Sequence, residues 1–251
     1  MRTSIYHSVN SGLFFWSGND GLLLDGLHQG GESGCSPMPD ALTAQLRCGC
    51  GLFAHITGLL FTHLHGDHYD AAYVDSLRNI RPELPVYTPE VWNGTGAKMG
   101  ENNKVRLGAA WVYAQRTLHD GAQFREVPHY SYLLQMGAET FLIAGDAQLT
   151  PEDAEKFQSF QTGGRLTAGF FNPYQLLSPS CQAFLRLLSL ERIFLIHLPF
   201  PRDDIFHYWA LARQSIERFP PELPPVEQLK HMAWLDDKPA PWAQMSVEEE
   251  K

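Results

Sequence analysis

Residues 62–68 read Thr-His-Leu-His-Gly-Asp-His, so three histidines and one aspartate fall within seven positions. They follow the apolar run Gly-Leu-Leu-Phe at 58–61, which is typical of a buried strand. A strand that ends here would deliver all four side chains to one point. Neutral imidazoles with a carboxylate suit zinc, iron and related ions. A polar turn rich in histidine is the simpler alternative, but this density of ligand-type side chains favours a metal site.

The bulk composition restricts the partners of the protein. The chain has 251 residues, enough to bury a core in one large domain or two small ones, and a formal net charge of −9. That charge argues against nucleic acid held on a broad basic surface and favours a small-molecule substrate. No apolar run reaches the length of a membrane span, and the first residues lack the pattern of a signal peptide. We therefore expect no membrane partner and a cytoplasmic location.

The four cysteines carry little functional signal. Their spacing resembles neither a disulfide framework nor a paired Cys-x-x-Cys zinc site. Cys48 and Cys50 are separated by one glycine and could form a metal or redox pair, but two incidental thiols in a loop are the expectation. A reducing compartment fits this cysteine usage best.

Apolar runs and turn signals predict many short strands with helices between them. Strands are expected at 13–16, 22–24, 59–62, 85–87, 111–117, 124–127, 130–135, 140–144, 166–171 and 192–196. Helices are expected at 39–47, 70–79, from Thr150 onward, and at 179–190 and 204–219. This pattern predicts an α/β fold with two mixed sheets in a single domain, 1–251. The excursion 26–55 is long for a connection and is a candidate lid. The tail 220–251 is expected to pack along the surface, with its last residues, 246–251, lacking order.

Three further ligand candidates lie beside other predicted strands. His129 immediately precedes the strand that begins at Tyr130. Asp146 follows the apolar run 141–144 and one glycine, and His197 ends the run 192–196. One metal ion needs about four ligands, and two ions need more, often with a bridging carboxylate. Each candidate alone is weak, but together with residues 62–68 they form a consistent set.

The complete pattern resembles the metallo-β-lactamase superfamily, whose motif Thr-His-x-His-x-Asp-His is followed by a histidine, a strand ending in Gly-Asp and a strand-end histidine. His129 lies 61 residues after His68, Asp146 lies 17 after His129, and His197 lies 51 after Asp146, spacings that suit that family. The resemblance covers roughly residues 13–199. It implies a four-layered αββα sandwich with the site along one edge, between the two sheets.

The resemblance also implies a role for each of these side chains. His63, His65 and His129 would hold one metal ion, Asp67, His68 and His197 would hold a second, and Asp146 would bridge them. Asp67 would in addition orient the nucleophilic water and accept or return its proton. Two divalent ions are thus the expected cofactors. Zinc is favoured, and manganese and iron also suit these ligands.

Other histidines are given structural roles. His119 precedes Asp-Gly and is expected in a turn, and His207 lies within a predicted helix. His28 lies in the segment after Asp25 that could border a pocket, so it is the one candidate for substrate contact, although a structural role is favoured for it as well.

A two-metal site with a bridging hydroxide performs hydrolysis, here of an ester, lactone, thioester, amide or phosphodiester of a small metabolite. True β-lactamases lack the bridging carboxylate and are exported, which disfavours antibiotic hydrolysis. The motif is also similar to that of tRNase Z, but residues 69–75 depart from its glycine-rich continuation. Residues 69–87 are more similar to small bacterial relatives of ascorbate-6-phosphate lactonase. The basic cluster by which glyoxalase II binds glutathione has no counterpart in the chain.

Two alternatives to this hydrolase stay open. One is an RNA-processing phosphodiesterase like tRNase Z, and the other is a metal-bound redox or sensing protein that uses the fold without hydrolysis. Diiron oxygen-reducing relatives carry glutamate at the position of His65 and come with a flavin domain. The sequence therefore favours the hydrolase.

Overall fold

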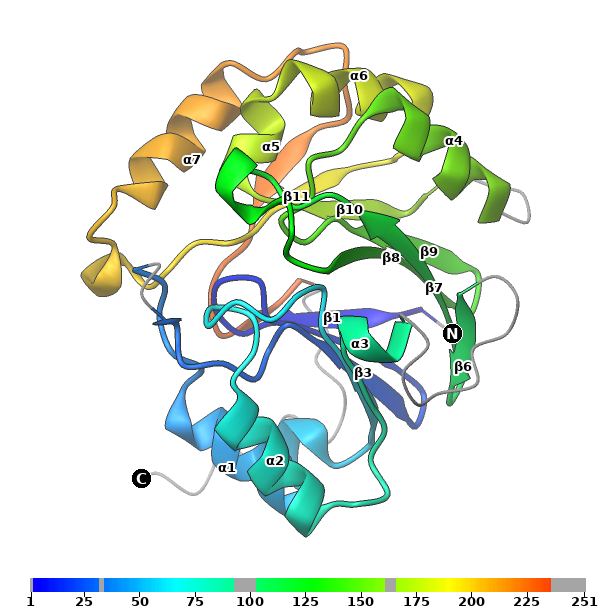
Figure 1. Cartoon of the computed structure of the whole chain (residues 1–251), viewed down its shortest axis with the longest axis vertical. Helices are drawn as coiled ribbons and strands as arrows, with labels where there is room; N and C mark the ends of the chain where they lie inside the picture. The colour runs from blue at the N-terminus through cyan, green and yellow to red at the C-terminus, as the bar shows by residue number, and fades with distance from the viewer. Residues whose placement is uncertain (1, 32–33, 93–102, 161–165, 236–251) are drawn as a thin grey trace.

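Two β-sheets pack face to face, and helices cover the outer face of each (Figure 1). The computed structural model describes residues 2–31, 34–92, 103–160 and 166–235. This arrangement confirms the predicted αββα sandwich of two mixed sheets.

The first sheet has six strands in the order β13-β1-β2-β3-β4-β5. Their bounds are β1 Ser4–His7, β2 Leu13–Ser17, β3 Asp20–Leu24, β4 Ile56–Leu60, β5 Val86–Tyr87 and β13 Ala233–Trp234. The pairs from β13 to β3 are antiparallel, whereas β3, β4 and β5 run parallel. The carboxyl ends of β3 and β4 therefore meet at the same edge of the sheet.

The second sheet has seven strands in the order β12-β11-β10-β9-β8-β7-β6. Their bounds are β6 Lys104–Leu107, β7 Ala110–Thr117, β8 His129–Met136, β9 Glu139–Ile143, β10 Ala168–Phe171, β11 Ile193–Leu195 and β12 Val226–Gln228. The strands from β6 to β9 are antiparallel, and those from β9 to β12 are parallel. The loops after β9, β10 and β11 consequently leave the same edge.

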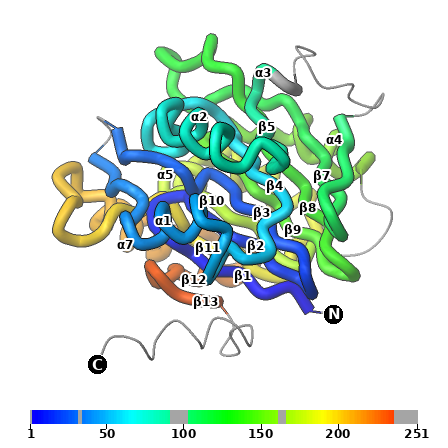
Figure 2. The backbone as a smooth tube through the Cα atoms, turned by 90° about the horizontal axis from the view of Figure 1, so that it is seen from below, coloured from blue at the N-terminus to red at the C-terminus, as the bar shows by residue number. Residues whose placement is uncertain are grey.

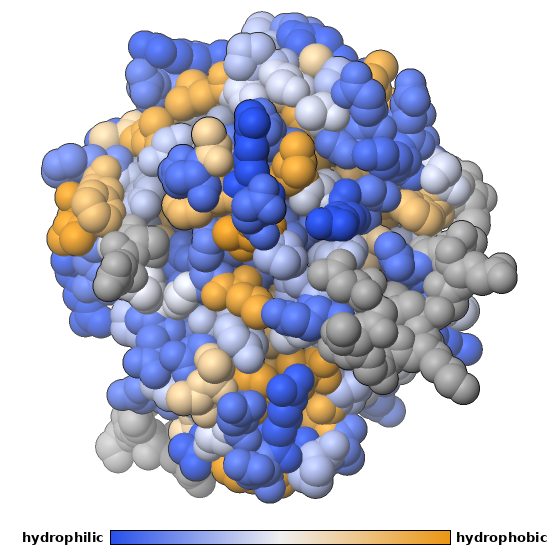
Figure 3. Space-filling view, viewed as in Figure 1, coloured by the Kyte–Doolittle hydropathy of each residue, from blue (hydrophilic) through white to orange (hydrophobic). Residues whose placement is uncertain are grey.

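Helices form the two outer layers. On the first sheet lie α1 Asp40–Cys48 and α2 Ala71–Ile80, side by side in Figures 1 and 2. On the second lie α4 Pro151–Phe160, α5 Pro173–Leu177, α6 Pro179–Leu187 and α7 Tyr208–Glu217. A short α3 spans Pro89–Trp92. The surface in Figure 3 is mostly hydrophilic with separate apolar patches, and no helix in the described part of the chain is both long and apolar enough to cross a bilayer.

The alternation of side chains along each strand explains why both faces of each sheet are covered. In β2, Leu13 and Phe15 point into the core between the sheets, whereas Phe14 packs against the helical layer of α1 and α2. In β8, Tyr132 and Leu134 face the central core, and Leu133 faces the opposite helical layer. Successive side chains of a strand point to opposite faces, so strands that are apolar on both faces require a cover on each side.

Several local predictions need correction. The strand predicted at 124–127 is absent, because Ala122–Phe124 forms a short 3-10 helix in the turn between β7 and β8. The segment after Pro220 does more than pack along the surface, since β12 extends the second sheet and β13 extends the first. Cys48 and Cys50, expected as two incidental thiols, are joined in a disulfide. Residues 246–251, expected to lack order, fall outside the described residues.

Candidate metal centre

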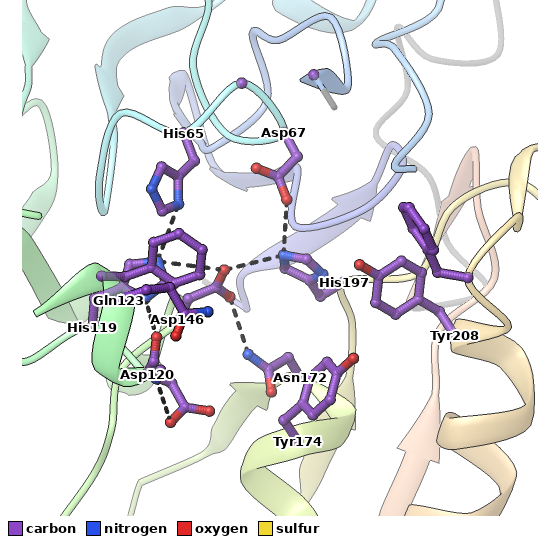
Figure 4. A pocket seen from close by; sticks show the side chains of 15 residues that line it. His65, Asp67, His119, Asp120, Gln123, Asp146, Asn172, Tyr174, His197 and Tyr208 are labelled. Atoms are coloured by element: carbon purple, nitrogen blue, oxygen red, sulfur yellow. Dashed lines mark hydrogen bonds and ion pairs between the residues drawn. The ribbon is translucent and has the colours of Figure 1, made fainter. Parts of the chain in front are cut away.

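The predicted ligands gather at one edge of the sandwich, where loops from both sheets meet over a pocket of about 980 Å³ (Figure 4). The loop after β4 contributes His65 and Asp67, and the turn after β7 contributes His119. Asp146 follows β9 and His197 follows β11. The described residues that line the pocket are Gly31, His65, Gly66, Asp67, His119, Asp120, Gly121, Gln123, Phe124, Asp146, Asn172, Tyr174, His197, Phe206 and Tyr208.

Two groups of side chains each bring their ligand-type atoms within 4.8 Å of one another. The first group contains His63, His65 and His119, and the second contains Asp67, His68, Asp146 and His197. We call them the three-histidine group and the aspartate group.

The Oδ2 atom of Asp146 lies between these groups. It is 3.3 Å from His197 Nε2 and 3.4 Å from His68 Nε2 in the aspartate group. It is also 3.8 Å from His63 Nε2 and 4.0 Å from His119 Nε2 in the three-histidine group. This position is the one expected of a carboxylate that bridges two ions.

His119, which the sequence hypothesis did not include among the ligands, lies with His63 and His65, whereas His129 does not belong to either group. His119 Nε2 lies 3.2 Å from His65 Nδ1, and His119 Nδ1 lies 2.7 Å from the carbonyl oxygen of Asp120. The carbonyl must accept the Nδ1 proton, so the Nε2 lone pair of His119 is directed at the three-histidine group.

His129 is fully buried behind this group, and protein atoms engage both of its ring nitrogens. Its Nε2 accepts the backbone N–H of Asp146 at 3.0 Å, and its Nδ1 lies 2.8 Å from Thr117 Oγ1. Thr117 Oγ1 is also hydrogen-bonded to the hydroxyl of Ser131 at 3.1 Å, and that hydroxyl donates to the carbonyl of Ala144. Since Nε2 already uses its lone pair, His129 in this arrangement supports the Asp146 loop rather than offering a ligand atom.

Asp25 is a supporting residue that the sequence reasoning missed. Its Oδ1 accepts the backbone N–H of Thr62 at 2.8 Å, and its Oδ2 accepts the Thr62 hydroxyl at 2.7 Å. Thr62 Oγ1 has given its only proton to Asp25, so it accepts from His63 Nδ1 at 3.0 Å. Asp25 Oδ2 also lies 3.0 Å from His68 Nδ1. One carboxylate thus helps to orient a histidine of each group and leaves both Nε2 atoms directed inward.

The Asp146 loop is fixed by close packing and by α5. Gly145 has φ of +59°, and a Cβ there would lie 2.8 Å from the Thr62 side chain and 2.7 Å from His129 Nε2, so only glycine fits. Asn172 caps α5 by accepting the N–H of Gln175 at 2.9 Å, while its own side-chain amide donates to Asp146 Oδ1 at 3.0 Å. The Asp146 carboxylate is therefore held through one oxygen, and Oδ2 is left to face both groups.

The backbone conformation of His197 fixes the position of its side chain. It has φ of +65°, in the left-handed region that non-glycine residues seldom adopt, and its N–H donates to the carbonyl of Asn10 at 2.8 Å. Asn10 in turn accepts from Ser36 N and donates to Ser36 O, which ties the predicted lid segment to this loop. Within that segment, Gly31 borders the pocket.

The predictions for two other histidines have different outcomes. His28 is completely buried and is not among the described residues that line the pocket, which agrees with the structural role favoured for it over substrate contact. His207 lies at the N-cap of α7 and is exposed rather than within a helix.

Comparisons with known proteins identify the fold. No protein-family profile and no curated protein matches this sequence. A possible metal-dependent hydrolase from Veillonella parvula superposes with a TM-score of 0.61 at 13% identity, covering 94% of this chain and 99% of that one. The metallo-β-lactamase fold protein YhfI from Bacillus subtilis gives a TM-score of 0.57 at 16% identity, covering 93% and 98%. The chain has the metallo-β-lactamase fold.

The same fold occurs in part of a larger protein. CmlA, a diiron β-hydroxylase from Streptomyces venezuelae, matches with a TM-score of 0.57 at 15% identity over 93% of this chain. The chain spans about half the length of CmlA, 54%. These likenesses identify the metallo-β-lactamase fold, and the chemistry must be argued from the site.

The electrostatics of the site favour neutral imidazoles in the three-histidine group. Burial, reinforced by the neighbouring His68, holds the pKa of His63 well below its usual range. Burial and the proximity of His119 lower the pKa of His65 in the same way. A neutral imidazole presents a lone pair, which is the form that binds a metal ion.

The aspartate group requires positive charge. Burial would raise the pKa of the Asp67 carboxyl, but His68 and His197 outweigh burial and hold that pKa below its ordinary value. Conversely, burial would lower the pKa of His68, but the neighbouring carboxylates, chiefly Asp146, raise it to about 10. Two carboxylates in so buried a place are stable only beside cations, either imidazolium groups or metal ions.

The donor set fits divalent metal ions. Histidine nitrogens and carboxylate oxygens suit zinc, manganese and iron alike. Moreover, the Nε2 atom of His63 is buried without any hydrogen-bond partner among the described residues, which is costly unless a ligand satisfies it. The structure thus presents a buried lone pair, two ligand groups and a carboxylate between them.

Proposed function

We propose that this protein is a hydrolase that holds two divalent metal ions, with zinc favoured, at the floor of the pocket. The observation that carries the proposal is the position of Asp146 Oδ2, within 3.3 to 4.0 Å of histidine nitrogens from both groups. The three-histidine group would hold one ion and Asp67, His68 and His197 the other, with Asp146 between them. His119 replaces His129 in the set of ligands expected from the sequence.

When bound, such a pair of ions lowers the pKa of an attacking water and polarises the oxygen of the scissile bond. Asp67 is the residue placed to orient that water and to accept or return its proton. Its carboxylate lines the pocket, and Oδ2 lies 3.3 Å from His197 Nε2, so its direction is fixed. Its low pKa keeps it ionised at neutral pH, the state in which it accepts hydrogen bonds from water.

Tyr208 supplies a second functional group on the pocket wall. Burial raises the pKa of its hydroxyl to about 12, so the hydroxyl keeps its proton at neutral pH. Its ring centroid lies 6.3 Å from that of His197, and its hydroxyl points toward this histidine in Figure 4. Tyr208 can therefore donate a hydrogen bond to a substrate oxygen on which negative charge develops.

The pocket offers no covalent nucleophile of the usual kind. None of the described residues lining it is a serine or a cysteine. This supports direct attack by water on an ester, lactone or phosphodiester of a small metabolite, without an acyl-enzyme step.

A non-hydrolytic redox or sensing role is the second candidate, because CmlA, a diiron β-hydroxylase, shares the fold. Histidine and aspartate ligands bind iron as well as zinc, so the ligand set is compatible with this role. An RNA-processing function has less support, since the described pocket lining contains no lysine or arginine to contact a phosphate backbone.

The test is a substrate panel for the metal-loaded protein, containing aryl esters, lactones, thioesters and bis(p-nitrophenyl) phosphate. We expect metal-dependent turnover of at least one class, abolished by a chelator and restored by added metal. If the protein retains two bound ions but turns over no member of the panel, the hydrolase proposal fails and the redox role gains weight.

A further inference from the structure

Beyond the ligand groups, the described residues that line the pocket carry four aromatic side chains, the amides of Gln123 and Asn172, and one acidic group, that of Asp120. Phe124 stands against the three-histidine group, with its ring centroid 5.0 Å from those of His65 and His119. On the other side, Tyr208 has its ring centroid 6.3 Å from that of Phe206 and 6.5 Å from that of Tyr174. Each ligand group is thus bordered by an aromatic wall.

Much of this aromatic surface is open. Phe206 is 57% exposed, Tyr174 is 52% exposed and Phe124 is 36% exposed. Figure 3 shows apolar surface at the side of the molecule where the chain enters α7, and Ile205 and Phe206 are exposed there. Apolar surface that lines a concave pocket without a protein partner is the usual mark of a site for an apolar ligand group.

The described lining also lacks a cationic side chain that could bind an anionic group of the substrate away from the ligand groups. Among the described residues around the pocket there is no lysine or arginine, whereas Asp120 adds a carboxyl group to the wall. Arginine and lysine are the side chains that proteins most often use to bind phosphate and carboxylate. An anionic group placed away from the ligand groups would therefore meet repulsion and no compensating charge.

The start of α7 does not replace these missing cations. A helix N-terminus can bind an anion through its free N–H groups. Here the N–H of Tyr208 already donates to Asp204 Oδ1 at 2.6 Å, and that of Trp209 donates to Asp204 Oδ2 at 3.1 Å. The helix end nearest the pocket is occupied by a carboxylate of the chain itself.

We propose that the substrate is an uncharged ester, thioester or lactone with an apolar acyl group, and that Asp120 and the aromatic walls select against anionic acyl groups and phosphodiesters. This inference rests on the proposed hydrolase function and narrows it. The reacting carbonyl would lie over Asp146, between the ligand groups. The apolar part would run along Phe124 on one side or along Phe206 and Tyr174 on the other.

The experiment compares three substrates of the metal-loaded enzyme: p-nitrophenyl hexanoate, mono-p-nitrophenyl adipate and bis(p-nitrophenyl) phosphate. The first two have acyl chains of equal length and differ in a terminal carboxylate remote from the reacting carbonyl. We expect kcat/KM for the hexanoate to exceed that for the adipate by about tenfold or more, mainly through KM, and the phosphodiester to be the poorest substrate.

Two variants test whether Asp120 and the aromatic walls cause the preference for the hexanoate over the adipate. Asp120→Asn should reduce the ratio of hexanoate to adipate several-fold, because it removes a negative charge and keeps the oxygen that accepts the N–H of Gly121 at 2.9 Å. Phe206→Ala should raise KM for the hexanoate more than KM for the adipate. Asp75→Asn is the matched control, since this carboxyl is 70% exposed on α2, outside the pocket, and its loss changes the net charge equally.

The outcomes separate the two proposals. Equal or better turnover of the adipate or of the phosphodiester overturns the substrate class while leaving the hydrolase proposal intact. An unchanged ratio in Asp120→Asn overturns the role of Asp120. Absence of turnover of all three by protein with both ions bound overturns the substrate class, whereas the hydrolase proposal fails only if the lactones and thioesters of the wider panel are also left unchanged.

Discussion

The Nε2 atom of His119 lies 3.2 Å from the Nδ1 atom of His65, although 54 positions separate the two residues in the chain. His119 gives its Nδ1 proton to the carbonyl of Asp120, so Nε2 is a lone-pair atom. In the metal-free protein His65 can donate to it. If a cation were bound by the three-histidine group, both nitrogens would be available as ligands. This pair therefore places His119 in the three-histidine group, whereas the Nε2 atom of His129 is occupied by the backbone N–H of Asp146.

Replacing these two histidines should have different effects on metal content. His119→Ala removes a predicted ligand, so this variant should lose about one of two bound ions. His129→Gln should keep both, because glutamine can still exchange hydrogen bonds with Asp146 N and Thr117 Oγ1, the partners of His129. Elemental analysis of purified variants measures this. The opposite pattern, loss in His129→Gln and retention in His119→Ala, would restore the ligand set expected from the sequence.

Asp67→Asn should reduce turnover of the best substrate by about 10²- to 10⁴-fold, the usual contribution of a positioned acid–base group. The amide has nearly the same shape but cannot accept the proton of an attacking water. Steady-state kinetics and metal content should be measured on the same preparation, with Asp75→Asn as the surface control. Wild-type activity in Asp67→Asn with bound metal would exclude Asp67 as the proton acceptor.

Asp25→Asn should weaken metal binding by about 10- to 100-fold, as expected when the group that orients a ligand histidine is changed. The asparagine amide would point donors at the Thr62 hydroxyl, which donates to the native carboxylate, or at His68 Nδ1, which lies 3.0 Å from that carboxylate. Titration of metal-free protein with a competing chelator gives the affinity, and circular dichroism checks the fold. Unchanged affinity would show that Asp25 only supports the backbone of Thr62.

The buried His129 should make the metal-free protein less stable as the pH falls below about 6.5. Burial lowers the pKa of His129 to about 3, so between pH 6.5 and 3 the unfolded chain binds a proton that the folded chain does not. The free energy of unfolding therefore decreases with falling pH, by at most about 1.4 kcal/mol per unit for one such group. His68, whose folded pKa is raised to about 10, is protonated in both states well below pH 6.5, so its opposing slope fades within about one pH unit of that value.

Denaturant unfolding between pH 6.5 and 5, in the presence of a chelator, measures this dependence. His129→Gln should show a shallower fall than the wild type, because one of the contributing groups has been removed. Equal slopes for the two proteins would mean that His129 titrates normally in the folded state.

The sequence predicts the layers well because the alternation of apolar residues directly reflects which faces of a strand are covered. Strands β2, β3, β7, β8, β9 and β10 and helices α1, α2 and α6 all overlap their predicted ranges. The missed strands include β12 and β13, which are short and lie at the edges of the sheets, where few apolar residues mark them. The strand expected at 124–127 failed because Gly121, with φ of +84°, starts a turn instead.

In the candidate site, the sequence alone does not determine whether His119 or His129 faces the pocket. His119 and His129 both lie near the paired ends of β7 and β8, where Thr117 is opposite His129. Either imidazole could have faced the pocket. The choice depends on the bend after β7, where Asp120 N donates to the carbonyl of Asp146. That long-range contact leaves no local pattern, although His119, like Asp146 and His197, follows a strand end and could have been included on that ground.

Asp25 was missed for a different reason. It follows the apolar run of β3, so the strand-end criterion applies to it as it does to Asp146. Its role becomes visible once β3 and β4 are seen to be parallel neighbours, with Leu24 opposite Leu60. Their shared edge brings Asp25 to Thr62.

The most direct test of the two-metal centre is the metal content of the native wild-type protein, purified without chelators and measured by elemental analysis against protein concentration. The two ligand groups around Asp146 predict close to two divalent ions per chain. A content near zero in folded protein, unchanged after incubation with zinc, manganese or iron, would contradict the two-metal centre and the hydrolytic function built on it.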